Sequence, residues 1–397
     1  MTRKFETPAR ELLLSPDSGL RRIQRAGIAA ALVGAVACAA GAAGARDEFY
    51  QAYLVAFLFW LGPALGSLGV LMLQHVTGGR WGIVLRRVLE AGAATLPLMA
   101  LLFVPVLFGL HSLYEWSRAG VTAHDAILAQ KQPYLNVPFF VARAVLYFAT
   151  WIAVAWCLVR WSRRLDEASD PRLVRRTQML SRGGLILYGL TMTFAAFDWG
   201  MSIEPHWYSH IYGVLVIGGQ ALSAMAFAIV VAAALARQPA IGRWVTADRF
   251  HDLGKLLLAF VMLWAYFSFS QYLIIWSGDL PEEIPWYLHR LAGGWRAVGI
   301  ALIVFHFAVP FVVLLSREVK RRPGALAAVA VGLLVLRWVE VYWLVVPTFH
   351  PTGLFVHWLA PATAVAMGGL WLAAFVRFLD RAPLLPVGEL EALLEED

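Results

Sequence analysis

The chain has 397 residues, of which 60% are hydrophobic and only 15% are charged, with a formal net charge of +7. Soluble domains average about 45–50% apolar and about 25% charged residues, so this composition excludes an ordinary soluble domain and indicates a polytopic membrane protein. The 17 tryptophans and 12 tyrosines fit the aromatic belts of membrane interfaces. The two cysteines, Cys38 and Cys157, lie in apolar runs and cannot supply the roughly four ligands of an iron–sulfur cluster. We therefore expect no metal site and no covalently bound cofactor.

Ten segments are long and apolar enough to cross a bilayer, which takes about 20 residues per helix. The first is rich in Ala and Gly and ends in Ala-Gly-Ala-Arg, so a cleaved signal peptide is the alternative. Its polar leader of about 25 residues is long for such a peptide, and we expect a retained helix. The sequence predicts an all-α membrane protein, with a transmembrane domain (26–378) between an N-terminal tail (1–25) and a C-terminal tail (379–397). The expected spans are 26–46, 49–73, 88–110, 136–160, 181–201, 211–236, 254–276, 294–316, 324–346 and 355–378.

Lysine and arginine are distributed unevenly between alternate loops, and this asymmetry predicts the orientation. Most of the 33 basic residues fall in the two tails and in the loops on the same side of the membrane. We therefore expect both termini to be cytoplasmic and the net charge to be a topology signal, not a nucleic-acid surface. The opposite loops hold only Arg46, Arg118, Lys131, Arg290 and Arg296.

The stretch Phe197-Asp-Trp-Gly-Met-Ser-Ile-Glu-Pro-His-Trp-Tyr-Ser-His-Ile-Tyr-Gly213 follows the fifth span on the predicted outer side. Ionisable groups beside a bilayer are costly and usually sit where function needs them. Asp198, Glu204 and His206 are therefore candidate acid–base residues that could accept a proton from a quinol hydroxyl. Trp199 and Trp207 could pack against the quinol ring. The same residues also fit an interfacial turn within an aromatic belt, and the sequence leaves both interpretations open.

Several ionisable residues lie inside the predicted spans. Arg143 has no acid at helical spacing in its own span, so we expect it to pair with Asp198, which lies at a similar depth on the next helix. Arg337 and Glu340 are three residues apart and share a helix face, as a packing ion pair or as part of a proton path. Glu90 lies near the cytoplasmic start of the third span. His306, at the middle of the eighth span, is expected to be a satisfied core histidine.

The seventh span carries a stripe of polar residues that includes Ser268, Gln271 and Tyr272. Side chains three or four residues apart on a helix share a face, so they could line a path for protons. With Glu90, Arg337 and Glu340 they form the candidate proton path. Interhelical hydrogen bonds are the alternative for each of them.

Three motifs together resemble one family: the stretch from Phe197, the segment Ser268-Phe-Ser-Gln-Tyr-Leu-Ile-Ile-Trp-Ser-Gly-Asp-Leu-Pro-Glu-Glu-Ile-Pro-Trp-Tyr287, and His75-Val-Thr-Gly-Gly-Arg-Trp81. The chain resembles the F subunit of bacterial alternative complex III, a quinol:cytochrome c (or electron-carrier) oxidoreductase. It is similar to the polysulfide-reductase (NrfD-like) membrane-subunit family over essentially its whole length. The resemblance implies two four-helix bundles, at about 49–201 and 211–346, flanked by the first and last helices.

The resemblance also implies the setting of the protein. It places the chain in the bacterial inner membrane, with quinol or menaquinol as a non-covalent ligand and membrane lipid around it. The implied partners are a sister NrfD-like membrane subunit, an iron–sulfur subunit and haem c subunits, which carry the redox centres. Quinol sites in the family lie at the outer face of the first bundle, which corresponds to Asp198, Glu204 and His206, with Arg143, Trp199 and Trp207 beside the quinol.

The expected function is that of an integral membrane subunit of a respiratory quinol:cytochrome c oxidoreductase that supports quinol binding, proton translocation or both. One alternative is a proton-path and scaffold subunit with no quinol site of its own. A second alternative is an independent secondary transporter. Transporters often contain broken helices, and the sequence shows no clearly broken helix, which argues against this alternative.

Overall fold

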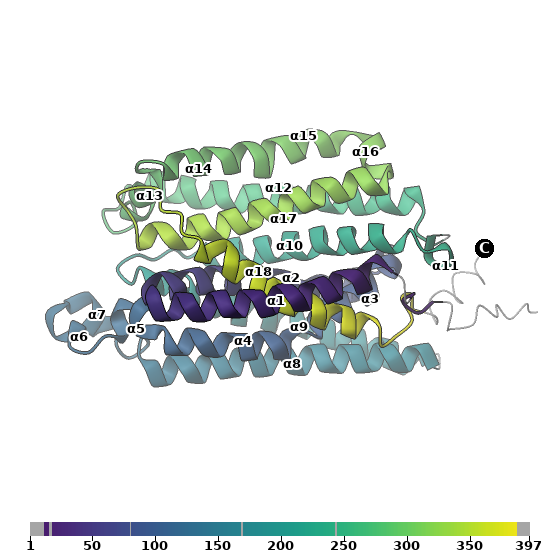
Figure 1. The fold of residues 1–397 in the computed structure, drawn as a ribbon, viewed down its shortest axis with the longest axis horizontal. Helices are drawn as coiled ribbons and strands as arrows, with labels where there is room; N and C mark the ends of the chain where they lie inside the picture. The colour runs from purple at the N-terminus through teal and green to yellow at the C-terminus, as the bar shows by residue number, and fades with distance from the viewer. Residues whose placement is uncertain (1–11, 16–17, 80, 168–169, 243, 387–397) are drawn as a thin grey trace, which may run out of the picture.

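The computed structural model describes residues 12–15, 18–79, 81–167, 170–242 and 244–386, and within these ranges it contains helices, turns and loops but no strand. In the same ranges, ten helices are long and apolar enough to cross a membrane. They lie side by side along the long axis of the molecule, as Figure 1 shows. The predicted all-α polytopic membrane fold is confirmed.

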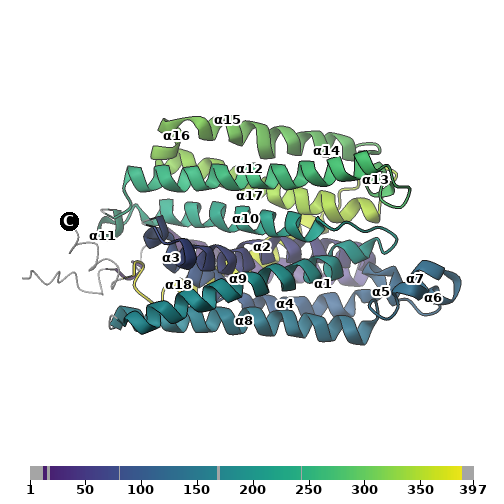
Figure 2. The same ribbon diagram turned by 180° about the vertical axis from the view of Figure 1, so that it is seen from behind.

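The first bundle contains four spans, the second of which is made of two helices. α2 and α9 pack against each other, and α8 packs against both α9 and α4. Seen from behind, α8 and α9 run across the lower half of the molecule (Figure 2). The bounds are α2 Arg46–Thr77, α3 Trp81–Ala93 with α4 Leu96–Phe108, α8 Val137–Glu167 and α9 Pro171–Trp199.

The second bundle contains the next four spans. α10 packs against α12 and α17, and α12 packs against α15. The third span of this bundle is α14 continued through a π-helical turn, η3, into α15. The bounds are α10 Tyr212–Leu235, α12 Ala247–Gly278, α14 Trp295–Ala301, η3 Leu302–Ala308, α15 Val309–Leu315 and α17 Pro323–Val345.

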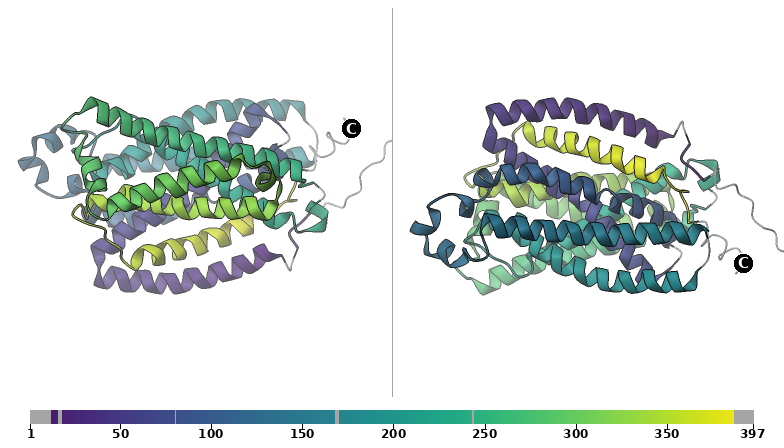
Figure 3. Two further views of the ribbon diagram at one scale, coloured as in Figure 1. Left: turned by 90° about the horizontal axis from the view of Figure 1, so that it is seen from above. Right: turned by 90° about the horizontal axis from the view of Figure 1, so that it is seen from below.

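The two bundles meet where α2 contacts α10, and the first and last spans, α1 Gly19–Gly44 and α18 Leu359–Leu379, lie together beside this contact. Figure 3 shows α1 and α18 as a pair along one side of the molecule. The most apolar window of α2 is 83% buried inside the protein, whereas that of α1 is only 17% buried. The core therefore runs along α2 and α10, and α1 leaves most of its surface for lipid. The helix at residues 19–44 agrees with the expected first span.

Short helices connect the spans at the two ends, which we call the α13 end and the α16 end. The α13 end carries α5 Leu110–Leu113, α6 Val121–His124, α7 Ala126–Lys131 and α13 Pro285–Leu291. The α5–α7 segment projects beyond the bundles at this end (Figure 1). The α16 end carries α11 Pro239–Gly242 and α16 Arg317–Arg321. The stretch from Asp198 to His210 lies at the α13 end.

Two spans are interrupted, which the sequence analysis did not anticipate. The third breaks between α3 and α4 because Pro97 has no N–H to donate to the carbonyl of Ala93. Thr95, at the break, donates to the Gly92 carbonyl at 2.6 Å and accepts from the Trp371 indole N–H at 2.8 Å. The eighth span widens at η3, where the Val309 N–H donates to the Val304 carbonyl five residues earlier. Pro310 follows directly, so the normal helical bond to His306 cannot form.

The α1–α18 contact depends on glycines spaced seven residues apart. Gly27, Gly34 and Gly41 are the buried glycines of α1 and they face α18. A Cβ placed on Gly34 would lie 2.3 Å from the Ala366 Cβ and 2.8 Å from its Cα. The helices can therefore approach this closely only because the position carries no side chain.

We expect Gly34→Ala to destabilise the protein by about 1–3 kcal/mol, because the added methyl overpacks a backbone contact. The measurement is the midpoint of thermal unfolding in detergent, followed by circular dichroism. The matched control is Gly183→Ala, since a Cβ at this exposed position of α9 meets nothing within 4 Å. The control should leave the midpoint unchanged or raise it, and an equal loss in both variants would contradict the packing argument.

Candidate functional site

Asp198 forms the predicted ion pair with Arg143. The Arg143 Nε donates to Asp198 Oδ2 at 2.8 Å, and its Nη2 donates to Oδ1 at 2.9 Å. The Tyr147 hydroxyl adds a third bond to Oδ2 at 2.9 Å, and the Asp198 side chain is 0% exposed. Three charge-assisted bonds satisfy a carboxylate strongly. This arrangement ties α8 to α9 and leaves Asp198 little capacity to bind another group.

Trp199 lies in an aromatic core. Its ring stacks on Phe148 with centroids 5.6 Å apart and lies 4.7 Å from the ring of Phe103. Trp151 meets it edge to face at 5.9 Å. The side chain is fully buried, so it packs the centre of the first bundle rather than a surface site. Trp207 lies elsewhere, stacked on Trp286 at 4.8 Å.

Glu204 belongs to a second cluster at the α13 end. Its Oε1 accepts hydrogen bonds from Arg290 Nη1 at 2.9 Å and from Thr348 Oγ1 at 2.5 Å. His289 Nδ1 lies 3.6 Å from Oε2. Arg290 is fully buried, and burial lowers the pKa of its guanidinium although the Glu204 carboxylate opposes this shift. The cluster joins the α9–α10 connection to α13 and to η4, Val346–Thr348.

His206 belongs to a third, exposed cluster. Its Nε2 lies 2.6 Å from Asp125 Oδ2, and Lys131 Nζ donates to the Pro205 carbonyl at 2.6 Å. Asp125 also caps α7, where its Oδ1 accepts from the Leu128 and Ile127 N–H groups. The bond from the Leu128 N–H and the bond with His206 hold the pKa of Asp125 below its usual value. His206 therefore fastens the α6–α7 segment to the loop after α9.

The three candidate acid–base residues thus lie in three separate ion pairs. Glu204, His206 and Trp207 line one open depression of about 570 Å³ at the α13 end, but Asp198 is not part of its lining. The reason is local: Asp198 occupies the last turn of α9 and faces the bundle interior, whereas the chain has left the helix by Glu204. Asp198 is therefore separated from Glu204 and His206 in the structure, although the three residues are close in sequence.

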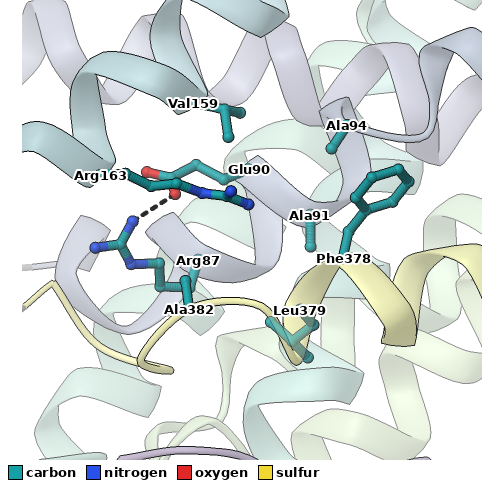
Figure 4. Close-up of a pocket in the computed structure, with 9 residues that line it drawn as sticks. All are labelled: Arg87, Glu90, Ala91, Ala94, Val159, Arg163, Phe378, Leu379 and Ala382. Carbon is teal, nitrogen blue, oxygen red and sulfur yellow. Dashed lines mark hydrogen bonds and ion pairs between the residues drawn. The ribbon is translucent and has the colours of Figure 1, made fainter. Parts of the chain in front are cut away.

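Glu90 lies near the opposite end of the first bundle. Its Oε2 accepts from Arg87 Nη1 at 2.7 Å and its Oε1 from Ser162 Oγ at 2.6 Å, and Arg87 also pairs with Asp166. Figure 4 shows Glu90 beside Arg87 and Arg163, with Phe378 of α18 on the far side. The cavity here is only about 10 Å³, room for roughly one water molecule. Glu90 is therefore far from the other predicted proton-path residues, at the α16 end.

Arg337 and Glu340 form an ion pair in the second bundle, as their spacing predicted. The Trp264 indole N–H donates to Glu340 Oε1 at 2.8 Å. The Arg337 guanidinium lies flat over α10, where a Cβ on Gly219 would be 2.4 Å from its Cζ. Gly219 therefore makes room for this buried cation.

His306 lies beside this pair and is fully buried. Its Nε2 is 3.6 Å from Glu340 Oε2, and its ring meets the Trp264 ring edge to face at 4.3 Å. Neither ring nitrogen has a hydrogen-bond partner among the described residues. The sequence predicted a satisfied core histidine, and the structure corrects this, because 3.6 Å exceeds normal hydrogen-bond length. The sequence missed this contact because the expected spans place His306 at mid-span and Glu340 nearer the outer end of its helix.

A cavity of about 780 Å³ lies between α12, α14–η3 and α17. Four of the predicted proton-path residues line it: Ser268, Gln271, Tyr272 and Glu340. Arg337 joins them through its ion pair with Glu340. Thus five residues chosen from sequence converge on the second bundle, and only Glu90 does not. Aromatic and apolar side chains form most of the remaining wall, including Trp264, Phe269, Trp286, Tyr287, Ile303, Phe307 and Trp343.

No protein-family model matches this sequence, and a search of curated proteins gives no significant match. The functional argument therefore rests on the fold and on these side-chain clusters.

We expect Arg143→Met to destabilise the protein by about 3–5 kcal/mol, because it leaves the buried Asp198 carboxylate without its cation. Adding Asp198→Leu should recover part of the loss, since the unpaired charge is then gone. The measurement is again the thermal midpoint in detergent. The control is Lys255→Met, which breaks an exposed pair with Asp252 and should cost less than about 1 kcal/mol. A double variant no more stable than Arg143→Met alone would contradict this account.

Proposed function

We propose that this chain is an integral membrane subunit of a respiratory quinol:cytochrome c oxidoreductase and that its second bundle handles protons within the membrane. The observation that carries the proposal is the group of Arg337, Glu340 and His306, buried in a membrane-spanning bundle beside a large cavity. Ionisable groups inside a membrane are costly to keep and by default point to an ion or proton pathway.

The chemistry of this group suits proton transfer. A carboxylate and an imidazole can each hold or release a proton. Glu340 Oε2 and His306 Nε2 are 3.6 Å apart, so a small movement brings them within hydrogen-bond reach. Arg337 holds the carboxylate in place from the other side.

The polar clusters at the two ends give this group an expected entry and exit. Glu340 lies five residues before the end of α17, about 8 Å along the helix axis. The Glu204–Arg290 cluster, which also bonds the Leu344 carbonyl, is at this same end. Glu90 and Arg87 lie toward the opposite end. We propose that protons move between Glu340 and the Glu204 cluster, and that Glu90 serves the α16 side.

The proposed setting follows from the family resemblance and from charge. Basic residues crowd the α16 end, so we place this end and both termini in the cytoplasm of a bacterial cell with the chain in its inner membrane. The α13 end then faces outward, where an iron–sulfur subunit and haem c subunits would receive electrons. A sister NrfD-like subunit would lie beside the chain, and quinol or menaquinol would come from the surrounding lipid.

One structural observation favours the alternative of a secondary transporter. Two spans are interrupted, at Thr95 and at η3, and interrupted helices often mark transport sites. The large cavity beside η3 is mostly apolar in its lining, which does not suit a polar substrate. The transporter therefore stands second to the redox subunit.

Purification from native membranes separates the two candidates. A tagged chain should bring down proteins that show haem c absorbance and iron–sulfur signals in electron paramagnetic resonance, together with quinol:cytochrome c reductase activity. A stable chain that purifies without any haem- or cluster-bearing protein would overturn the proposal and favour the transporter.

We expect Glu340→Gln to slow coupled quinol oxidation and proton release in the intact complex at least tenfold, because the amide neither accepts nor donates the transferred proton. The readouts are reduction of cytochrome c and acidification outside reconstituted vesicles. The matched control is Glu318→Gln, at an exposed carboxylate on α16, which should leave both rates unchanged. Wild-type rates in Glu340→Gln would remove Glu340 from the proton path.

A further inference from the structure

We propose that the 780 Å³ cavity of the second bundle binds the hydroxylated ring of a lipid-soluble ligand, with ring hydroxyls donating to Glu340 and to Gln271. The inference rests on the proposed function in one respect, namely that the respiratory quinone is the natural ligand. It places this ligand in the second bundle, away from the Asp198 stretch on which the sequence argument centred.

The size and lining of the cavity suit such a ring. Ligand pockets are typically about 300–1,000 Å³, mostly apolar, with a few polar groups that fix orientation. This cavity is about 780 Å³ and has three tryptophans in its wall, Trp264, Trp286 and Trp343. Indole rings offer flat surfaces on which another ring can stack.

The polar groups stand ready for a ring with oxygen substituents. Gln271 is only 1% exposed, and its Oε1 has no hydrogen-bond partner among the described residues. A buried polar atom without a partner is unfavourable, and a bound hydroxyl could donate to it. Glu340 lines the same cavity and uses Oε1 for Trp264 and Oε2 for Arg337. Each carboxylate oxygen has a second lone pair, so Glu340 can accept a ring hydroxyl as well.

The cavity has an opening toward the membrane. Several of its lining side chains are exposed on the outside of the bundle, among them Phe269 at 61% and Ile303 at 64%. These residues lie on α12 and η3, within the length that spans the bilayer. A ligand can therefore enter from the lipid between these two helices, and an apolar tail can remain in the acyl-chain region.

The π-helical turn shapes this opening. Leu302, Ile303 and Phe307 of η3 all line the cavity, and π-helical turns occur frequently at functional sites. The same turn carries His306 behind Glu340, with both ring nitrogens free of partners among the described residues. His306 therefore lies at the deep end of the site, with its Nε2 3.6 Å from Glu340 Oε2.

A lipid acyl chain is the competing occupant, and the polar groups argue against it. An acyl chain would fill the apolar part but would leave the Gln271 oxygen unpaired. A ring hydroxyl can donate to this amide oxygen or to the free lone pairs of Glu340. A ring that lacks such oxygens would gain only the stacking.

The test is photolabelling of the protein purified from native membranes in its own assembly, with the reduced (quinol) form of an azido-ubiquinone probe and peptide mapping by mass spectrometry. We expect label on peptides from α12, α14–η3 and α17, and competition by decylubiquinol. Gly299→Leu should reduce this labelling at least tenfold, because Gly299 lines the cavity and a side chain there projects toward Trp343. Gln271→Leu should reduce it about tenfold. Gly332→Leu, where a Cβ meets nothing within 4 Å, is the matched control and should label like wild type.

Two results would overturn the inference. One is label confined to other peptides, in particular those around Asp198. The other is label on these peptides that phospholipid displaces as effectively as decylubiquinol, or label that Gly299→Leu does not reduce. Either outcome would make the cavity an acyl-chain groove. Thermal midpoints equal to wild type exclude misfolding of the variants. The proposed function is tested separately. If no haem- or cluster-bearing partner co-purifies with the chain, the proposed function fails even if the cavity is labelled.

Discussion

The cost of placing charge inside a membrane governs the interior of this protein. An unpaired ion there costs several kcal/mol, so each buried ion needs a partner. Arg143 meets Asp198, Arg87 meets Glu90, and Arg337 meets Glu340. The first of these pairs joins two helices. Each of the other two lies within its own helix at a spacing of three residues. These two pairs also contact neighbouring helices, where Ser162 bonds Glu90 and Trp264 bonds Glu340. Helix packing around the pairs is therefore fixed by polar bonds as well as by apolar contact.

Much of the fold could be predicted from the sequence, because hydrophobic length and helical rise give both the spans and the depth of each residue. This is why Arg143 could be assigned to Asp198, on another helix, before the structure was known. The interruptions at Thr95 and η3 were missed, although Pro97 and Pro310 stand in the sequence. A proline in a long apolar run can kink a helix, break it or shift it into a π-helical turn, and only the packing around it decides.

The candidate site could be predicted in part. The polar stripe of the seventh span was selected by periodicity, and periodicity also places Ser268 and Gln271 on one face, toward the cavity. For the stretch after Phe197, by contrast, the sequence pattern did not predict which residues lie together. Its residues are close in sequence, but the helix ends at Trp199, so Asp198 follows the helical geometry and His206 follows the loop. Proximity along the chain does not give proximity in space once a helix has ended. The cavity itself depends on three helices from different parts of the sequence, which no local pattern could bring together.

Asp198 and Glu340 differ in how completely their hydrogen-bonding capacity is used. Asp198 has three hydrogen bonds from two side chains, so it has the character of a structural centre. Glu340 keeps spare capacity, and His306 and the Gln271 oxygen have no partners among the described residues. Unsatisfied groups in a buried site are a cost to stability that persists where a ligand or a proton uses them. Asp198 therefore contributes to rigidity in the first bundle, whereas Glu340 and Gln271 line a cavity in the second. A quinol that enters this cavity would meet a carboxylate already held in place by Arg337, with His306 beside it.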